Sequence, residues 1–182
     1  MPIDLNVSAD IRRAEQALRG LKNGTSTVVV RSMNRAIRKA QTVAVKSMAQ
    51  ALPALRQRTI RQATALKLAR RNDWVAATSA KGGRIPIMDL QARQTQRGVT
   101  YRAQGGRRLI PAAFIARMSS GHAGVFKRKG RSRLPIQELY GPSIPRVFVQ
   151  RYVLDATDAA ARDEWARESA RQINLLRTQN GL

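Results

Sequence analysis

The order of the hydrophobic periods along the chain predicts an α+β fold: N-terminal helices, including one long helix, then a central antiparallel sheet and a long C-terminal helix. Apolar residues recur at helical spacing, then alternate in short runs separated by glycines and prolines, and finally return to helical spacing. Neither βαβ alternation nor a repeat of solenoid period is visible. We expect a single domain over residues 1–182, with 1–71 mainly helical, 72–140 forming the sheet and 143–178 the last helix.

Helices are expected before the sheet. The first covers residues 8–20, between a serine at the N-cap and a glycine stop. The second runs from Thr25 to about Leu52, where Pro53 ends or kinks it. Its inward stripe comprises Val29, Met33, Ala36, Ile37, Ala40, Ala44 and Met48, and its opposite face carries Arg31, Arg35, Arg38, Lys39 and Lys46. A short helix is expected within residues 54–71.

Short runs of β-forming residues predict the strands of the sheet. They cover residues 74–78, 85–90, 98–102, 112–118, 125–126 and 134–139. Gly105-Gly106 predicts a turn, residues 119–121 predict a hairpin turn, and residues 127–133 predict a basic loop. The last helix follows, with Val149, Val153, Ala156, Ala160, Ala166, Ala170 and Ile173 facing inward and charges of both signs facing outward.

Positive charge is concentrated in one part of the chain. Residues 16–137 hold 26 Lys and Arg against only Asp73 and Asp89, so this segment has a charge of +24. The charges of the two flanks nearly cancel, and the whole chain has a net charge of +23. The bases are 27 Arg and 7 Lys. Because the arginine fork binds phosphate or carboxylate through two hydrogen bonds, the composition predicts contact with a polyanion or an acidic protein surface.

The residues needed for catalysis are scarce. Without cysteine, the chain has no disulfide, thiolate nucleophile or Cys-containing metal site. Its only histidine, His122, lies in a Gly-flanked turn and is interpreted as a solvated loop residue. The glycine pairs at residues 82–83 and 105–106 lack the phosphate-loop spacing and are interpreted as turns. We expect no enzyme activity, no cofactor, no metal and no small-molecule substrate.

The sequence also bears on where the protein is made. It contains no run of 18 apolar residues and no leader in which a basic segment precedes an apolar one. We therefore expect a soluble chain made in the cytoplasm, with no membrane partner.

Three proline-containing segments occur in a fixed order in the region of the expected sheet. They are Arg84-Ile85-Pro86-Ile87-Met88-Asp89-Leu90, Ile110-Pro111-Ala112-Ala113-Phe114-Ile115, and Arg133-Leu134-Pro135-Ile136 leading to Ile144-Pro145. With Met33-Asn34-Arg35-Ala36 in the Ala-rich helix, they make residues 25–150 resemble the phage minor tail protein Z family, which are tail completion proteins of long-tailed phages. The resemblance implies a structural virion protein at the head-proximal end of the tail, assembled in the host cytoplasm. Its implied neighbours are the tail terminator, the tail tube and the head–tail connector. Next to them, the chain would form a six-fold ring around the DNA path.

The number of phosphates limits how such a ring could use its charge. Duplex DNA carries one phosphate per ~1.7 Å, so a ring ~40 Å thick encloses about 24 of them. One subunit's basic segment already matches that number, so we expect a minority of arginines to face DNA and the rest to face acidic proteins or carboxylates of other subunits. The candidate contacts are Arg31, Arg35, Arg38 and Lys39 on the helix, and Arg107, Arg108, Lys127, Arg128, Lys129, Arg131 and Arg133 in loops.

Two other hypotheses fit part of the sequence. A non-specific basic nucleic-acid-binding protein, ribosomal or nucleoid-like, explains the charge but not the ordered proline-containing segments. A divalent-ion-dependent nuclease would have to use Asp73 and Asp89, the only carboxylates in the basic region.

Overall fold

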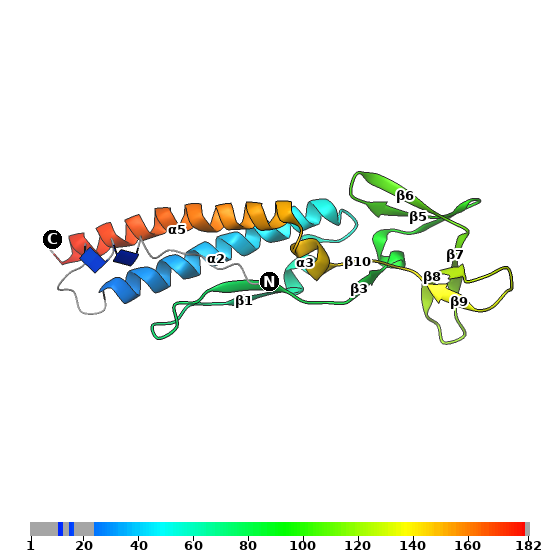
Figure 1. Ribbon diagram of the computed structural model, residues 1–182, viewed down its shortest axis with the longest axis horizontal. Helices are drawn as coiled ribbons and strands as arrows, with labels where there is room; N and C mark the ends of the chain where they lie inside the picture. The colour runs from blue at the N-terminus through cyan, green and yellow to red at the C-terminus, as the bar shows by residue number, and fades with distance from the viewer. Residues whose placement is uncertain (1–10, 13–14, 17–23, 181–182) are drawn as a thin grey trace. The chain divides into compact units, whose positions relative to one another are not determined.

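The α+β class predicted from the sequence is confirmed: a long helix, α2, is followed by antiparallel strands and by a second long helix, α5 (Figure 1). The structure is a computed structural model and describes residues 11–12, 15–16 and 24–180. Two compact units are present. The helical unit contains the described parts of Met1–Val45 and Val149–Leu182 together with Thr64–Ala80, and the sheet unit contains Lys46–Ala63 and Lys81–Phe148. The single-domain organisation stays a prediction.

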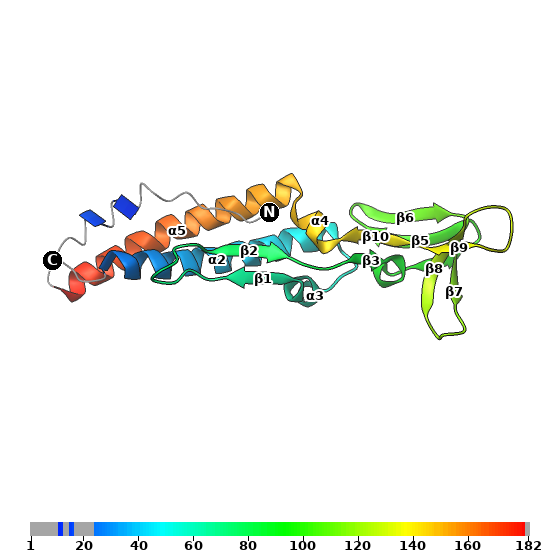
Figure 2. The ribbon, with the colours of Figure 1, turned by 60° about the horizontal axis from the view of Figure 1, so that its bottom comes forward.

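Helix α2 spans Gly24–Ala51 and ends just before Pro53, as the sequence predicts. Every residue of its predicted inward stripe is buried, and the basic residues of the opposite face are exposed. Within the helical unit, α2 and α5 lie side by side and antiparallel (Figures 1 and 2). The helix expected over residues 8–20 falls mostly outside the described residues; residues 11–12 and 15–16 are helical.

A hairpin completes the helical unit. Strands β1 (Thr64–Lys67) and β2 (Ala77–Ala80) pair antiparallel, with Thr64 opposite Ala80. Leu66 and Leu68 pack against the core cluster that α2 and α5 share, which includes Ile37 and Trp165. Residues 64–67 were expected in a helical stretch and residues 74–76 in a strand, and both expectations are wrong. Leucines two residues apart reach one core only from an extended chain.

The segment Met33–Ala36 holds the parts of the helical unit together. Met33 and Ala36 are buried in the core cluster. The Asn34 side chain accepts a hydrogen bond from the Ala69 N–H (2.8 Å) and donates one to the Ala69 carbonyl oxygen (3.1 Å). This pair of bonds fixes the loop after β1 to α2.

The sheet unit contains three small antiparallel sheets instead of the one sheet expected, ordered β3–β10, β4–β5–β6 and β7–β8–β9. Its elements are α3 (Gln57–Gln62), β3 (Arg84–Pro86), the 3-10 helix η1 (Ile87–Leu90), β4 (Arg93–Thr95), β5 (Gly98–Ala103), β6 (Gly106–Pro111), β7 (Ala113–Arg117), β8 (Ala123–Arg128), β9 (Ile136–Glu138), β10 (Tyr140–Ser143) and α4 (Ile144–Phe148). The predicted strand over residues 98–102 and the hairpin turn at residues 119–121 are confirmed.

Two segments of the sheet unit differ from expectation. Residues 85–90 form a strand only as far as Pro86, because Ile87 and Leu90, three residues apart, are both buried by one turn of 3-10 helix. Residues 106–111 form strand β6 instead of a loop. Gly98 explains the close pairing of β5 with β6, because a Cβ at this position would collide with the Ile110 carbonyl oxygen.

The segment Ile110–Ile115 is a corner between two sheets. Ala112 has a left-handed backbone (φ 57°) and turns the chain from β6 into β7. Its N–H donates to the Arg97 carbonyl oxygen (3.2 Å), which fixes the corner. The most specific of the family-like segments therefore has a structural role.

The single C-terminal helix expected over residues 143–178 is divided into α4 and α5 (Arg151–Gln179). Gln150, with an extended backbone (φ −69°, ψ 137°), precedes the first turn of α5. The predicted inward face is partly wrong, because Val149, Ala166 and Ala170 are exposed. The residues buried along α5 are Val153, Thr157, Ala161, Glu164, Trp165, Glu168, Ser169 and Gln172. Polar groups take these places because they have partners on α2 and α5.

Candidate functional site

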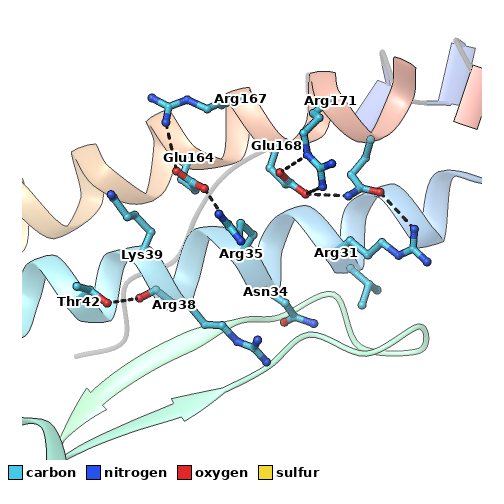
Figure 3. A pocket seen from close by; sticks show the side chains of 12 residues that line it. Arg31, Asn34, Arg35, Arg38, Lys39, Thr42, Glu164, Arg167, Glu168 and Arg171 are labelled. Carbon is cyan, nitrogen blue, oxygen red and sulfur yellow. Dashed lines mark hydrogen bonds and ion pairs between the residues drawn. The ribbon is translucent and has the colours of Figure 1, made fainter. Parts of the chain in front are cut away.

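An open groove of about 1000 Å³ lies along α2 and α5 in the helical unit (Figure 3). The two helices supply six basic side chains to it: Arg31, Arg35, Arg38 and Lys39 from α2, and Arg167 and Arg171 from α5. Glu164 and Glu168 also line it, together with the polar side chains of Asn34, Thr42 and Gln172. The four α2 residues predicted from the sequence are therefore together in one site.

Glu164 joins the two helices. Its Oε1 accepts a hydrogen bond from Arg35 Nε (3.1 Å), and its Oε2 lies 3.7 Å from Arg167 Nη1. The Glu164 side chain is only 10% exposed, whereas that of Arg35 is 68% exposed. A buried carboxylate is tolerated only when it is paired and hydrogen-bonded, so Arg35 is needed to keep Glu164 in place.

Glu168 is the centre of a second network. Its carboxylate accepts two hydrogen bonds from Arg171 (2.9 and 2.6 Å) and one from Gln172 Nε2 (2.7 Å). Arg171 is the main reason that the pKa of the Glu168 carboxyl falls from 4.5 to about 2, although burial acts in the opposite direction. Gln172 Oε1 in turn accepts a hydrogen bond from Arg31 Nη1 (3.3 Å), which links this network to α2.

The groove keeps an excess of positive charge after these contacts. Its six basic side chains face two carboxylates, a local balance of +4. Within the part of the chain that the structure describes, Arg38 and Lys39 form no ion pair. The groove can therefore bind a further anionic group without breaking an existing contact.

The α5 half of this groove is not predicted from the sequence. Glu164 and Glu168 are four residues apart, as are Arg167 and Arg171, which places each pair on one helix face. That spacing is the available signal, but a helix face with charges of both signs is equally typical of a solvated surface.

The remaining predicted residues lie in the sheet unit, on two different sheets. Arg107 and Arg108 are in strand β6, not in a loop as expected, because Gly106–Pro111 pairs along the whole of β5. Lys127 and Arg128 end strand β8, so the basic loop is shorter than expected and contains Lys129, Arg131 and Arg133. Among the described residues, no hydrogen bond or ion pair joins the β6 pair to this loop, so the two do not form one cluster.

Local contacts hold two of these arginines. Arg107 Nη2 donates to the carbonyl oxygens of Gln91 (2.9 Å) and Thr100 (3.1 Å). The Arg128 guanidinium lies 5.4 Å from the centre of the Phe114 ring, a cation–π contact. The sheet unit as a whole carries 18 Lys and Arg against Asp89 and Glu138. Its charge is almost entirely uncompensated.

His122 and Glu138 form the main titratable cluster outside the groove. His122 Nε2 lies 2.9 Å from Glu138 Oε1, and the Tyr140 hydroxyl donates to Glu138 Oε2 (2.8 Å). The Tyr140 hydroxyl, and then His122, lower the pKa of the Glu138 carboxyl. His122 lies in the turn between β7 and β8 and is about half exposed. This arrangement fastens the hairpin to β9.

The two carboxylates of the nuclease hypothesis lie in different units. Asp73 pairs with Lys67 Nζ (2.8 Å) in the helical unit, and Asp89 is in η1 of the sheet unit. In the described ranges, no group of three or more His, Cys, Asp or Glu side chains could hold a metal ion. None of the described helices is long and apolar enough to cross a membrane.

The fold and these surfaces define a class of protein: a strongly basic α+β protein whose Lys and Arg outnumber its carboxylates in both units. The sequence profile of the prophage minor tail protein Z family matches residues 11–178, nearly the whole chain. The chain therefore belongs to the prophage minor tail protein Z family, as its proline-containing segments indicate. It is a structural protein of a phage tail, located in the virion, where it contacts other tail or virion proteins. No curated protein and no solved structure matches the chain.

Proposed function

We propose that this chain completes the tail at its head-proximal end and helps to join the tail to the head. Six copies form a ring around the DNA path, next to the tail terminator, the tail tube and the head–tail connector. The role is structural, without catalytic activity, and contact with the viral duplex is non-specific.

The observation that supports this proposal most strongly is the uncompensated charge of the sheet unit, where 18 Lys and Arg face two carboxylates. Such an excess destabilises a compact protein by self-repulsion unless an anion neutralises it. In a phage tail, the viral duplex is the polyanion available. A ring ~40 Å thick encloses about 24 phosphates, and the sheet units of six copies would carry several times that much positive charge. Acidic neighbouring proteins are therefore the expected partners of the remaining bases.

Particles made without this chain test the proposal. Electron microscopy should show tails with an altered head-proximal end and few stable head–tail joints, and expression of the wild-type chain should restore both. A tagged chain in complemented particles should be labelled at the head-proximal end. Normal, infectious particles without the chain, or labelling at the distal end, would contradict the proposal. Purified protein incubated with duplex DNA and Mg²⁺ should leave the DNA intact.

A further inference from the structure

We propose that the groove along α2 and α5 binds an acidic α-helix of a neighbouring virion protein. The helix carries carboxylates about one turn apart along a single face. The proposal rests on the proposed function only in placing the partner in the virion; the chemistry of the partner follows from the groove itself.

The arginines of the groove are already held in position for an anion. Arg35 uses Nε to bind Glu164, and Arg171 uses Nε and Nη2 to bind Glu168, so each keeps further N–H donors. The side chains of Arg35, Arg167 and Arg171 remain 60–75% exposed although the two carboxylates beneath them are nearly buried (Figure 3). Side chains that are fixed before binding lose less conformational entropy when a ligand arrives.

The spacing of the basic residues matches a helix. Arg31, Arg35 and Lys39 follow one another at intervals of four residues along α2, as do Arg167 and Arg171 along α5. Four residues of α-helix rise ~6 Å, so the groove presents cations in straight rows with ~6 Å steps. Carboxylates four residues apart on a partner helix have the same step. The phosphates of a duplex wind around its axis, so a straight groove meets only a few of them.

The shape of the site also favours a helix. Two helices that lie side by side leave a furrow that a third helix can occupy, with axes ~8–10 Å apart. The polar groups of Asn34, Thr42 and Gln172 line this furrow. A partner helix can therefore form hydrogen bonds as well as ion pairs there.

A second copy of this chain does not fit as the occupant. Among the described carboxylates, Asp73, Asp155, Asp158, Glu164 and Glu168 are already in ion pairs, and Glu138 is hydrogen-bonded to His122 and Tyr140. The described carboxylates outside these contacts, Glu15, Asp89 and Asp163, do not form a row at helical spacing. With a net charge of +23, two copies also repel each other. The described carboxylates and the net charge therefore favour a different protein as the source of the acidic helix.

Two isomeric peptides test the proposal with the full-length protein. Both are Ala-based, about 20 residues long and helical by circular dichroism. One carries its glutamates at alternating spacings of four and three residues, which keeps them on one face, and the other distributes the same number around the helix. At ~0.15 M salt, fluorescence anisotropy should show the one-face peptide binding at least about fivefold more tightly, because only its carboxylates meet the rows together. Equal binding of the two peptides would overturn the proposal.

Charge reversal locates the binding site. The groove variant is Arg38→Glu with Lys39→Glu, two residues that form no ion pair with any described residue, and the matched control is Arg131→Glu with Arg133→Glu in the sheet unit. The groove variant should bind the one-face peptide about tenfold more weakly than wild type, and the control less than about threefold. Binding to a random duplex of about 20 base pairs should be weakened more by the sheet-unit control than by the groove variant. Equal peptide losses in both variants, or a duplex affinity that depends mainly on the groove, would overturn the proposal. Particle morphology enters neither measurement, so this test and that of the proposed function can fail separately.

Discussion

The helical unit carries 16 Lys and Arg against nine carboxylates, whereas the sheet unit carries 18 against two. In the helical unit, carboxylates on α5 bind arginines on both long helices, so part of the charge builds the structure. In the sheet unit, nearly all the positive charge is left for contacts outside the chain. We therefore expect substitutions of the paired groups in the helical unit to change stability, and substitutions of sheet-unit bases to change binding to duplex DNA.

Substitution in the core cluster of the helical unit should cause the largest loss of stability. Trp165 is 2% exposed and belongs, with Ile37, to the core cluster that α2 and α5 share. Trp165→Ala should lower the free energy of unfolding by about 3–5 kcal/mol, measured by urea denaturation, because it leaves a cavity. Trp74→Ala, at a residue that is 36% exposed, is the matched control and should cost far less. Equal losses would show that the groove does not depend on this core.

Loss of the Asn34 contact with Ala69 should cause the second-largest loss of stability. Asn34→Ala leaves both the N–H and the carbonyl oxygen of Ala69 without their partner and should cost about 2–3 kcal/mol. Asn34→Asp keeps an acceptor for the N–H but removes the donor, so its stability should be intermediate. The exposed Asn72→Ala is the control and should be near neutral. An alanine variant as stable as wild type would contradict this role for the Met33–Ala36 segment.

Glu168 tests whether charge in the helical unit stabilises the fold. Glu168→Gln should cost about 1–2 kcal/mol at pH 7, since the hydrogen bonds from Arg171 lose their charged acceptor. The folded pKa of about 2 is lower than the ordinary 4.5, so the carboxylate stabilises the protein above about pH 4.5. This contribution disappears as the pH falls from 4.5 towards 2.

Urea unfolding of wild type and Glu168→Gln at several pH values checks this sign. The difference in unfolding free energy between the two proteins should shrink steadily below about pH 4.5. The exposed Asp163→Asn variant is the control and should follow wild type across the range. A difference that is constant with pH would mean that Glu168 acts through packing and not through its charge.

The sequence predicts the α2 half of the groove but not the α5 half. The α2 stripe consists of large apolar residues such as Val29, Ile37 and Met48, whose burial follows from their spacing alone. The stripe on α5 consists largely of alanines, which are tolerated on either face. Its true inward face includes Glu164, whose burial depends on Arg35, 129 residues away in the sequence. Helical periodicity contains no information about such a partner.

For the strands, too, the sequence predicts only what depends on residues adjacent in the chain. The hairpin of β7 and β8 is predictable because its turn and both flanking runs are adjacent in sequence. Strand β6 carries exposed arginines where a buried strand would be apolar, so its pattern resembles a loop. Its extended form is set by pairing with β5 and by the close approach that Gly98 permits. The division of the strands into several small sheets likewise depends on turns such as that at Ala112.

The basic loop between β8 and β9 gives a smaller effect, in binding rather than in stability. Replacing Lys129, Arg131 and Arg133 together by alanine should weaken binding to a random duplex about three- to tenfold and reduce the slope of log K against log salt by about 2–3. The control triple Arg151, Arg162 and Arg177 to alanine removes the same charge from α5 and should change the slope less. If the loop variant instead lost stability, the contrast between the two units would be wrong.

The smallest effect is expected where an arginine of the sheet unit does contribute to the fold. Arg128 lies over the Phe114 ring at 5.4 Å, so Arg128→Met, which keeps the apolar stem, should cost about 0.5 kcal/mol. Arg131→Met in the adjacent loop removes the same charge and is the control. Combining Arg128→Met with Phe114→Leu in a double-mutant cycle isolates the contact, and the coupling should again be about 0.5 kcal/mol. A coupling of zero would place Arg128 with the bases available to bind anions, which would make the contrast between the two units sharper.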